Sequence, residues 1–215
     1  MKLALCFMGR IDLHQYKLYE KSFETVKKNV IGNNDCDIFI HAWDDNGINK
    51  SKIIELLQPK DYKIEKIIEN NKEKSRWLSH KKSLNILENY TKKNDIYDFV
   101  FVCRLDIYFK TSFNFNDYEK GKLYIENWAT HEIKDKDIIK KYGFCDLWFF
   151  GCQYTLKNFK NIYDEINKSN LKTQDGNHLI VYNYIIFKNI DYILIKNVLK
   201  DSDISRRVLG NMKIK

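Results

Sequence analysis

The chain has 215 residues, of which 44% are hydrophobic and 14% aromatic, so it can bury one sizeable core and a single domain is expected. No apolar run approaches the roughly 18 residues that a membrane helix needs, and the amino-terminal stretch is typical of a short strand ending in Gly9 and Arg10 rather than of a signal peptide. The net charge of +8 is spread over mixed-charge segments without a basic arm. It is compatible with nucleic acid, with a phosphate-bearing small molecule and with peripheral contact at an anionic membrane surface.

The cysteines favour a reducing compartment. They are odd in number, show no Cys-x-x-Cys spacing and mostly lie within apolar runs. These features predict reduced core thiols in a cytoplasmic protein, rather than a metal cluster or disulfides. The cysteines are Cys6, Cys36, Cys103, Cys145 and Cys152.

The first half of the chain alternates strands with helices. This βαβαβαβ order predicts an α/β fold with a mainly parallel central sheet that helices cover on both faces. Ser51 is the expected N-cap of the second helix, and Pro59 follows its end. Strands are predicted at 2–8, 36–41, 63–68 (an edge strand) and 97–103, and helices at about 14–29, 51–57 and 75–90.

The second half has a different pattern. The polar segment 127–141 is long enough for a functional flap. No repeat, linker or low-complexity tract marks a boundary, so we expect one domain over 1–215. Strands are predicted at 122–126, 145–152 and 192–195, helices at about 156–167 and 177–187, and a basic tail follows with Asp201, Asp203, Arg206 and Arg207.

The most distinctive segment is the apolar run at 99–103 followed by Arg104 and Asp106. Its β-branched and aromatic residues predict a strand buried on both faces. Open α/β sheets bind their ligands at the carboxyl ends of such strands, so this charged pair is the first candidate for chemistry. An ion pair that closes the end of a core strand explains the pattern equally well.

Several motifs occur together in a fixed order. They are Gly9-Arg10 after the opening strand, Asp-Ile-Phe-Ile-His-Ala-Trp at 37–43, the helix with Ser79, Lys81 and Lys82, Tyr-Asp-x-Val-x-x-x-Arg-x-Asp at 97–106, and Asp-x-x-Phe-x-Gly at 146–151. Over about residues 1–190 the chain resembles the small GT-A glycosyltransferases of bacterial polysaccharide loci and large DNA viruses. The resemblance implies a single GT-A-like domain that moves a sugar from a nucleotide-diphosphate sugar to a glycan or a lipid-linked acceptor. Residues 1–110 would then form the nucleotide-binding half, and 111–215 the acceptor half and tail.

Donor binding is expected at the ends of the first two strands. Gly9 allows the backbone to approach a ribose or pyrophosphate closely, and Arg10 can bind phosphate with its guanidinium fork; the alternative is an ordinary turn. The segment after the second strand offers His41, Trp43 and Asp45 to a base or ribose, although a single histidine is more often structural.

The helix before the central strand adds one more donor candidate. Lys81 is a candidate for the sugar or diphosphate, unless it belongs to an exposed lysine pair with Lys82.

The resemblance also implies a metal ion. Family members hold Mn²⁺ or Mg²⁺ against the diphosphate with an Asp-x-Asp motif after the central strand. Here only Asp106 is present, so either it binds the metal with help from water and the diphosphate, or Arg104 replaces part of the metal's electrostatic role. The later Asp201-Ser202-Asp203 is expected to cap a terminal helix. The alternative is a tail that folds back, with Asp203 as a metal ligand and Arg206 or Arg207 on phosphate.

The acceptor hydroxyl needs a proton acceptor, and Asp146 and Asp175 are the two candidates. Asp146 opens an otherwise apolar strand, whereas Asp175 could simply cap a helix. Two other functions compete with glycosyl transfer. A catalytically weak nucleotide-sugar-binding module would explain the missing first carboxylate. A nucleic-acid-binding protein fits the net charge, but no RNA-binding motif or zinc-ligand spacing occurs, so no nucleic-acid partner is expected.

Overall fold

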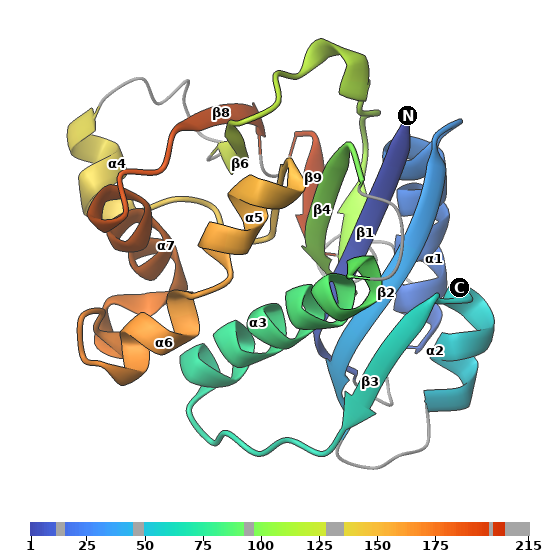
Figure 1. Ribbon diagram of the computed structural model, residues 1–215, viewed down its shortest axis with the longest axis horizontal. Helices are drawn as coiled ribbons and strands as arrows, with labels where there is room; N and C mark the ends of the chain where they lie inside the picture. The colour runs from blue at the N-terminus through green and yellow to red at the C-terminus, as the bar shows by residue number, and fades with distance from the viewer. Residues whose placement is uncertain (12–15, 45–49, 93–96, 128–135, 198–199, 205–215) are drawn as a thin grey trace.

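The computed structural model describes residues 1–11, 16–44, 50–92, 97–127, 136–197 and 200–204 (Figure 1). They form an α/β domain around a seven-stranded sheet of order β3-β2-β1-β4-β7-β6-β8. Every pairing in this sheet is parallel except those that β7 makes with β4 and β6, which confirms the predicted fold class. A small second sheet pairs β5 with β9. The strands are β1 (Lys2–Arg10), β2 (Asp35–Trp43), β3 (Asp61–Glu65), β4 (Phe99–Arg104), β5 (Ile107–Phe109), β6 (Leu123–Asn127), β7 (Trp148–Gly151), β8 (Tyr192–Asn197) and β9 (Ser202–Ile204).

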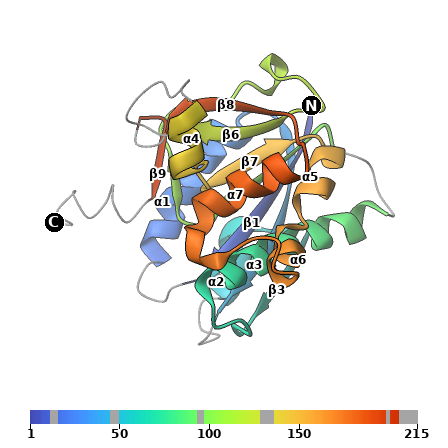
Figure 2. The same cartoon turned by 90° about the vertical axis from the view of Figure 1, so that its left-hand side faces the viewer.

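The helices are α1 (Tyr16–Val26), α2 (Lys50–Leu57), α3 (Lys72–Thr91), α4 (Lys136–Tyr142), α5 (Gln153–Phe159), α6 (Ile162–Asn167) and α7 (Gly176–Phe187). They cover both faces of the sheet. Alternate residues of β1 enter two cores because successive side chains of a strand point to opposite faces. Leu3 and Leu5 pack in a cluster with α1 and α2, whereas Ala4 and Cys6 pack in a cluster with α3 and α5 to α7. Figure 2 shows α4 beside α7 on this second face. Among the described helices, none has the length and apolar composition that crossing a bilayer requires.

The central strand lies where its composition predicts. β4 sits between β1 and β7, and Phe99, Phe101 and Cys103 are almost completely buried. The ring of Phe101 stacks on Trp148 and Phe150 of β7, with centroid distances of 5.5 and 5.6 Å. The predictions of an internal strand within 97–103 and of a strand within 145–152 are therefore confirmed, and the two strands are neighbours.

Some predicted boundaries are wrong. The expected helix 156–167 is two helices, because Asn161 between α5 and α6 leaves the helical conformation with φ −85° and ψ 10°. Ser51 lies inside α2 and is not its N-cap. α3 begins three residues earlier than expected, because the Asn71 side chain caps it by accepting the Lys74 N–H at 2.9 Å. β3 is the predicted edge strand, but it spans 61–65 rather than 63–68.

Candidate functional site

The order of the strands reverses beside β1. From β1 the chain moves outward to β2 and β3, and it then returns to place β4 on the other side of β1. In open α/β sheets, ligands bind at such a switch point, outside the carboxyl ends of the strands. Met8 lies opposite Arg104 in the β1–β4 register. Gly9, Arg10, Arg104 and Asp106 therefore share one edge of the sheet, termed the switch edge below.

Gly9 holds an unusual backbone conformation at the switch edge. Its φ of +124° is rarely adopted by residues with a side chain. The Gly9 N–H donates to Ser79 Oγ at 2.9 Å, which ties the end of β1 to α3. Arg10 is exposed and lies opposite Trp43 of β2 in the strand register. An approaching ligand therefore meets glycine backbone and an exposed guanidinium here.

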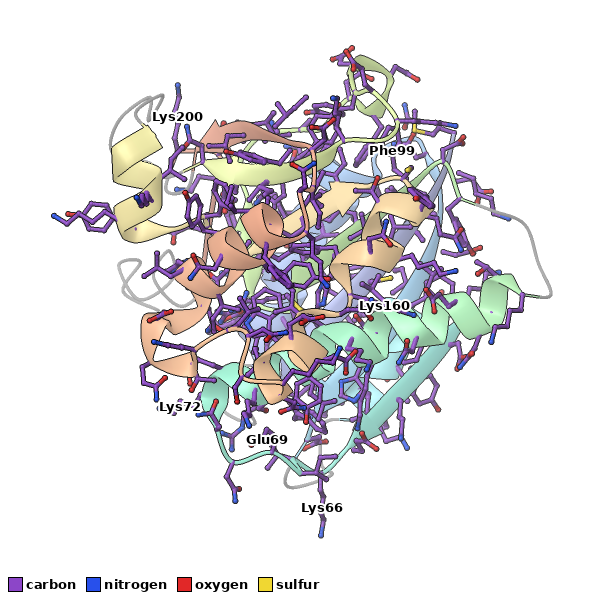
Figure 3. All side chains as sticks on the ribbon, turned by 60° about the vertical axis from the view of Figure 1, so that its left-hand side comes forward. Lys66, Glu69, Lys72, Phe99, Lys160 and Lys200 are labelled. Carbon is purple, nitrogen blue, oxygen red and sulfur yellow. The ribbon has the colours of Figure 1, made fainter. Side chains whose placement is uncertain are left out.

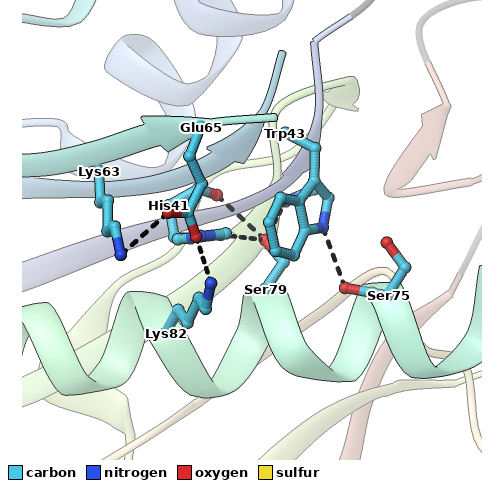
Figure 4. Close-up of polar contacts among 8 residues, drawn as sticks. His41, Trp43, Lys63, Glu65, Ser75, Ser79 and Lys82 are labelled. Carbon is cyan, nitrogen blue, oxygen red and sulfur yellow. Dashed lines mark hydrogen bonds and ion pairs between the residues drawn. The ribbon is translucent and has the colours of Figure 1, made fainter. Parts of the chain in front are cut away.

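His41 belongs to a buried polar network (Figure 4). Its Nδ1 lies 2.8 Å from Ser79 Oγ and its Nε2 lies 3.3 Å from Glu65 Oε1. Glu65 also binds Lys63 at 2.9 Å, and Lys82 pairs with the same carboxylate. Burial lowers the pKa of His41 to about 4, so its ring is neutral and Nε2 carries the proton toward Glu65. With both nitrogens engaged and no exposed surface, His41 fits the structural alternative better than a ligand contact.

Trp43 is equally enclosed. Its Nε1–H donates to the Ser75 carbonyl oxygen at 3.0 Å, Lys82 Nζ lies 4.8 Å from its ring centroid, and only 1% of the residue is exposed. Trp43 therefore joins β2 to α3 and does not present its ring to a base. Asp45, which was expected beside it, lies outside the described residues.

Lys81 does not point to the switch edge. Its Nζ binds both carboxylate oxygens of Asp164 in α6, at 2.5 and 2.7 Å. Other lysines are paired with acidic residues in the same way, including Lys160 with Glu88. Figure 3 shows charged side chains of both signs along the surface, among them Lys66 and Glu69 between β3 and α3. This mixed-charge surface is consistent with the absence of a basic arm in the sequence.

Arg104 and Asp106 form a bidentate ion pair. Arg104 Nε and Nη2 donate to the two oxygens of Asp106 at 2.7 and 2.6 Å. Burial disfavours the charge, yet the Asp106 carboxylate holds the pKa of Arg104 above its ordinary value. The two side chains remain 24% and 13% exposed. The pair was the expected alternative to a ligand contact, but the guanidinium keeps further N–H donors for a ligand.

A second arginine, Arg76 of α3, lies near this pair. Its Nη1 is 2.8 Å from Asp146 Oδ2, and its Nη2 donates to the Asp146 carbonyl oxygen. Burial lowers the pKa of Arg76, Asp146 opposes this shift, and the charge of Arg104 adds to it. Two guanidinium groups and two carboxylates therefore form one partly buried network. Sequence reasoning missed Arg76, whose only signal was an arginine between Ser75 and the apolar Trp77.

The second oxygen of Asp146 contacts His178 near the start of α7. His178 Nδ1 lies 3.2 Å from Asp146 Oδ1 and 3.0 Å from the carbonyl oxygen of Phe144. Both neighbours are hydrogen-bond acceptors, so Nδ1 carries a proton and donates toward them. Gly143 permits this arrangement, because a Cβ on it would lie 2.2 Å from the backbone of His178.

Asp175 occupies a different environment from Asp146. It ends the short 3₁₀ turn Thr173–Asp175 directly before α7, is exposed, and makes no side-chain cap to that helix. Asp146 is 4% exposed. Of the two candidates, only Asp175 is therefore open to solvent.

Glu126 at the end of β6 is completely buried. It accepts hydrogen bonds from Ser202 Oγ and, at 3.1 Å, from Cys145 Sγ. Trp148 Nε1–H also belongs to this network, because it donates to Ser202 Oγ at 3.3 Å. Burial raises the pKa of Glu126 to about 7, so this carboxyl group takes up a proton near neutral pH. No sequence motif distinguished Glu126.

The tail corrects one prediction. Asp201 and Ser202 were expected to cap a terminal helix, but Ser202–Ile204 is strand β9, which pairs antiparallel with β5. The prediction failed because Ser202 bonds Glu126 and β9 completes a sheet with a distant segment, neither of which local sequence reveals. The alternative of a tail that folds back is confirmed, whereas a metal-binding role for Asp203 stays a prediction. Arg206 and Arg207 lie outside the described residues.

The titration of Glu126 predicts a pH-dependent stability. The folded-state pKa of Glu126 lies above the ordinary value of 4.5. Its stabilising contribution to folding is therefore fully present below pH 4.5 and is lost as the pH rises through about 7. From pH 5 to 8, the free energy of unfolding of the parent should fall by about 2 kcal/mol relative to Glu126→Gln. Urea unfolding of both proteins across this range measures the difference. A parallel pH dependence of the two proteins would contradict the prediction.

The described residues do not fit a metal ion held by the protein. Mn²⁺ and Mg²⁺ require several oxygen ligands, yet both Asp106 oxygens accept hydrogen bonds from Arg104. Asp203 is 6% exposed, and its Oδ1 accepts the Ile204 N–H at 2.7 Å. In the part of the chain that the structure describes, no three His, Cys, Asp or Glu side chains group closely enough to hold a metal. A metal at Asp106 would have to share this carboxylate with the Arg104 guanidinium.

Comparison with known proteins assigns no family to this chain. No protein-family model matches the chain, and no curated protein matches it either. Functional inference therefore depends on the switch edge and the groups around it.

Proposed function

We propose that this protein is a glycosyltransferase that moves a sugar from a nucleotide-diphosphate sugar to a glycan or lipid-linked acceptor. The observation that carries the proposal is the switch point between β1 and β4, where Gly9 and exposed Arg10 end one strand and Arg104 and Asp106 follow the neighbouring one. A guanidinium binds phosphate oxygens in a fork, and glycine lets phosphate approach the backbone. These features suit a diphosphate.

Arginine charge takes over the electrostatic role that the resemblance assigns to a metal. When the bond between the sugar and the diphosphate breaks, negative charge grows on the leaving phosphate. Arg104 has N–H donors beyond the two that bind Asp106, and Arg76 places a second positive charge close by. Nucleotide binding should therefore depend only weakly on Mn²⁺ or Mg²⁺.

The acceptor hydroxyl loses its proton as its oxygen attacks the anomeric carbon, and Asp146 and Asp175 remain the two acidic candidates for this step. Asp146 is enclosed by Arg76 and touches His178. It would act most directly by orienting His178, whose imidazole would then take the proton. Asp175 would act as a base itself from its exposed position before α7.

Replacement of Arg104 by alanine is expected to weaken nucleoside-diphosphate binding about 10- to 100-fold, because a hydrogen bond to a charged group contributes about 1.5 to 3 kcal/mol. Arg10→Ala should weaken binding with or without Mn²⁺. Thermal shifts with UDP, GDP, CDP, ADP and dTDP, each with and without Mn²⁺, measure these effects, since a ligand of the native state raises stability by RT ln(1 + [L]/Kd). Lys66→Ala, which removes an exposed positive charge, is the control.

Two results would overturn the placement of the donor. Unchanged nucleotide shifts in both arginine variants would remove the switch edge from the site. Asp106→Asn tests the metal: a loss of binding only in the presence of Mn²⁺ would assign Asp106 to a metal, whereas an equal loss in both conditions would assign it to orienting Arg104.

A nucleotide-sugar-binding module without transferase activity is the second candidate. It is favoured by the arginine at position 104, whose guanidinium occupies both oxygens of the one carboxylate of the motif. Donor hydrolysis or transfer to glycan acceptors separates the two functions. We also propose a cytoplasmic location, since all five cysteines are free thiols, as a reducing compartment requires.

A further inference from the structure

A cavity of about 390 Å³ lies at the edge of the sheet opposite the switch edge. Gly121 lies just before β6 and Ile190 lies just before β8. Thr155 follows β7, which runs antiparallel to β6. All three residues therefore lie at the same edge of the sheet, away from the carboxyl ends of β1 and β4. The volume is within the range of roughly 300 to 1,000 Å³ found for ligand sites. The cavity, termed the distal cavity, is lined by Gly121, Tyr154, Thr155, Asn158, Asn161, Tyr184, Lys188, Asn189, Ile190 and Asp191.

The charged groups of the distal cavity are already neutralised. Lys188 Nζ lies 3.0 Å from Glu165 Oε1, and Lys122 Nζ lies 2.9 Å from Asp191 Oδ2. An anionic ligand would compete with the glutamate for Lys188, and a cationic ligand would compete with the lysine for Asp191. The cavity therefore favours a ligand without net charge.

The hydrogen-bonding groups that remain are amides. The side chains of Asn158, Asn161 and Asn189 form no hydrogen bond with any residue that the structure describes. Each amide both donates and accepts, which matches hydroxyl groups that do the same. At the floor, the buried Tyr184 ties α7 to α5, because its Oη–H donates to the Asn158 carbonyl oxygen at 2.6 Å.

Tyr154 supplies an apolar face at the rim. It is the second residue of α5 and is 75% exposed, an unusual position for so large a ring. The face of a tyrosine packs against apolar C–H groups while its hydroxyl stays in water. A sugar ring offers both kinds of surface, with C–H groups on its faces and hydroxyls around its edge.

We propose that the distal cavity is a binding site for a neutral glycan, separate from the donor site. The inference stands on the chemistry of the cavity and goes beyond the proposed transfer reaction. In a transferase, this site would hold a distant part of a long acceptor.

Saturation-transfer NMR with cellotriose, maltotriose, chitotriose and mannotriose tests the site. At least one trisaccharide should receive saturation from the parent protein, and Tyr154→Ala should weaken its affinity at least tenfold by titration calorimetry. Tyr142→Ala is the matched control, since it removes another exposed tyrosine, on α4, and should leave affinity unchanged. Each trisaccharide is supplied at about 10 mM, a concentration high enough to populate a weak site. Absence of saturation from all four at this concentration would overturn the proposal.

Equal affinity in the parent and Tyr154→Ala would also overturn it. The thermal shift with nucleoside diphosphates separates this test from that of the donor site. Tyr154→Ala should retain the parental nucleotide shift, whereas Arg104→Ala should reduce that shift and retain trisaccharide binding. A negative result for trisaccharide binding therefore leaves the nucleotide experiment interpretable, and the reverse also holds.

Discussion

Removal of the acceptor-side base is expected to slow sugar transfer about 10²- to 10⁴-fold at nearly unchanged donor affinity. Asp146→Asn and Asp175→Asn keep the shape of each side chain while removing its charge. The reason for the loss is that the attacking acceptor hydroxyl then lacks the group that takes its proton. Initial rates with a labelled donor, together with calorimetric donor affinities, measure the effect.

The contact between Asp146 and His178 makes this experiment more specific. If Asp146 positions His178, then Asp146→Asn and His178→Gln should slow transfer by similar factors, and the double variant should be no slower than the slower single variant. The pH–rate profile of Asp146→Asn should then differ from that of the parent, which a purely structural role would leave unchanged. Parental rates in Asp146→Asn, Asp175→Asn and His178→Gln would place the base elsewhere.

Gly143→Ala is expected to lower the free energy of unfolding by about 3 kcal/mol or more. The new Cβ would lie 2.2 Å from the carbonyl carbon and oxygen of His178, and φ at this position is +75°. Backbone atoms cannot move aside as a flexible side chain can, so the start of α7 must shift. Chemical denaturation of the variant and the parent measures the loss.

Gly121→Ala is the control for Gly143→Ala. Gly121 also has a positive φ, +97°, but no heavy atom of the described residues lies within 4 Å of a Cβ placed there. Gly121→Ala should therefore lower the free energy of unfolding only by the cost of backbone strain, about 1 to 3 kcal/mol. An equal loss in the two variants would mean that contact with His178 contributes nothing.

The fold was predictable where local pattern and burial agree. The run at 99–103 is apolar on both faces, and it forms the internal strand β4 for that reason. The break between α5 and α6 was not predictable from spacing, because apolar residues continue at helical intervals through Asn161. Strand β9 was missed because its three residues are stabilised by partners far away in the chain.

The candidate site was predictable only in part. Arg104 and Asp106 could be found because they interrupt an apolar run at the end of a strand. Arg76 and Glu126 could not, since each resembles an ordinary charged residue until its partner is known. Their partners, Asp146 and Ser202, are distant in sequence, and only the folded sheet brings them together.

The pairing of β5 with β9 joins two segments that lie far apart in the chain. β5 directly follows β4, whereas β9 comes after every other described strand. During synthesis the central sheet can form while β5 still presents an open edge, and Glu126 still lacks the hydroxyl of Ser202. An unpaired edge of this kind can recruit strands from other chains. Strand β9 therefore covers an edge of β5 that could otherwise pair with another chain.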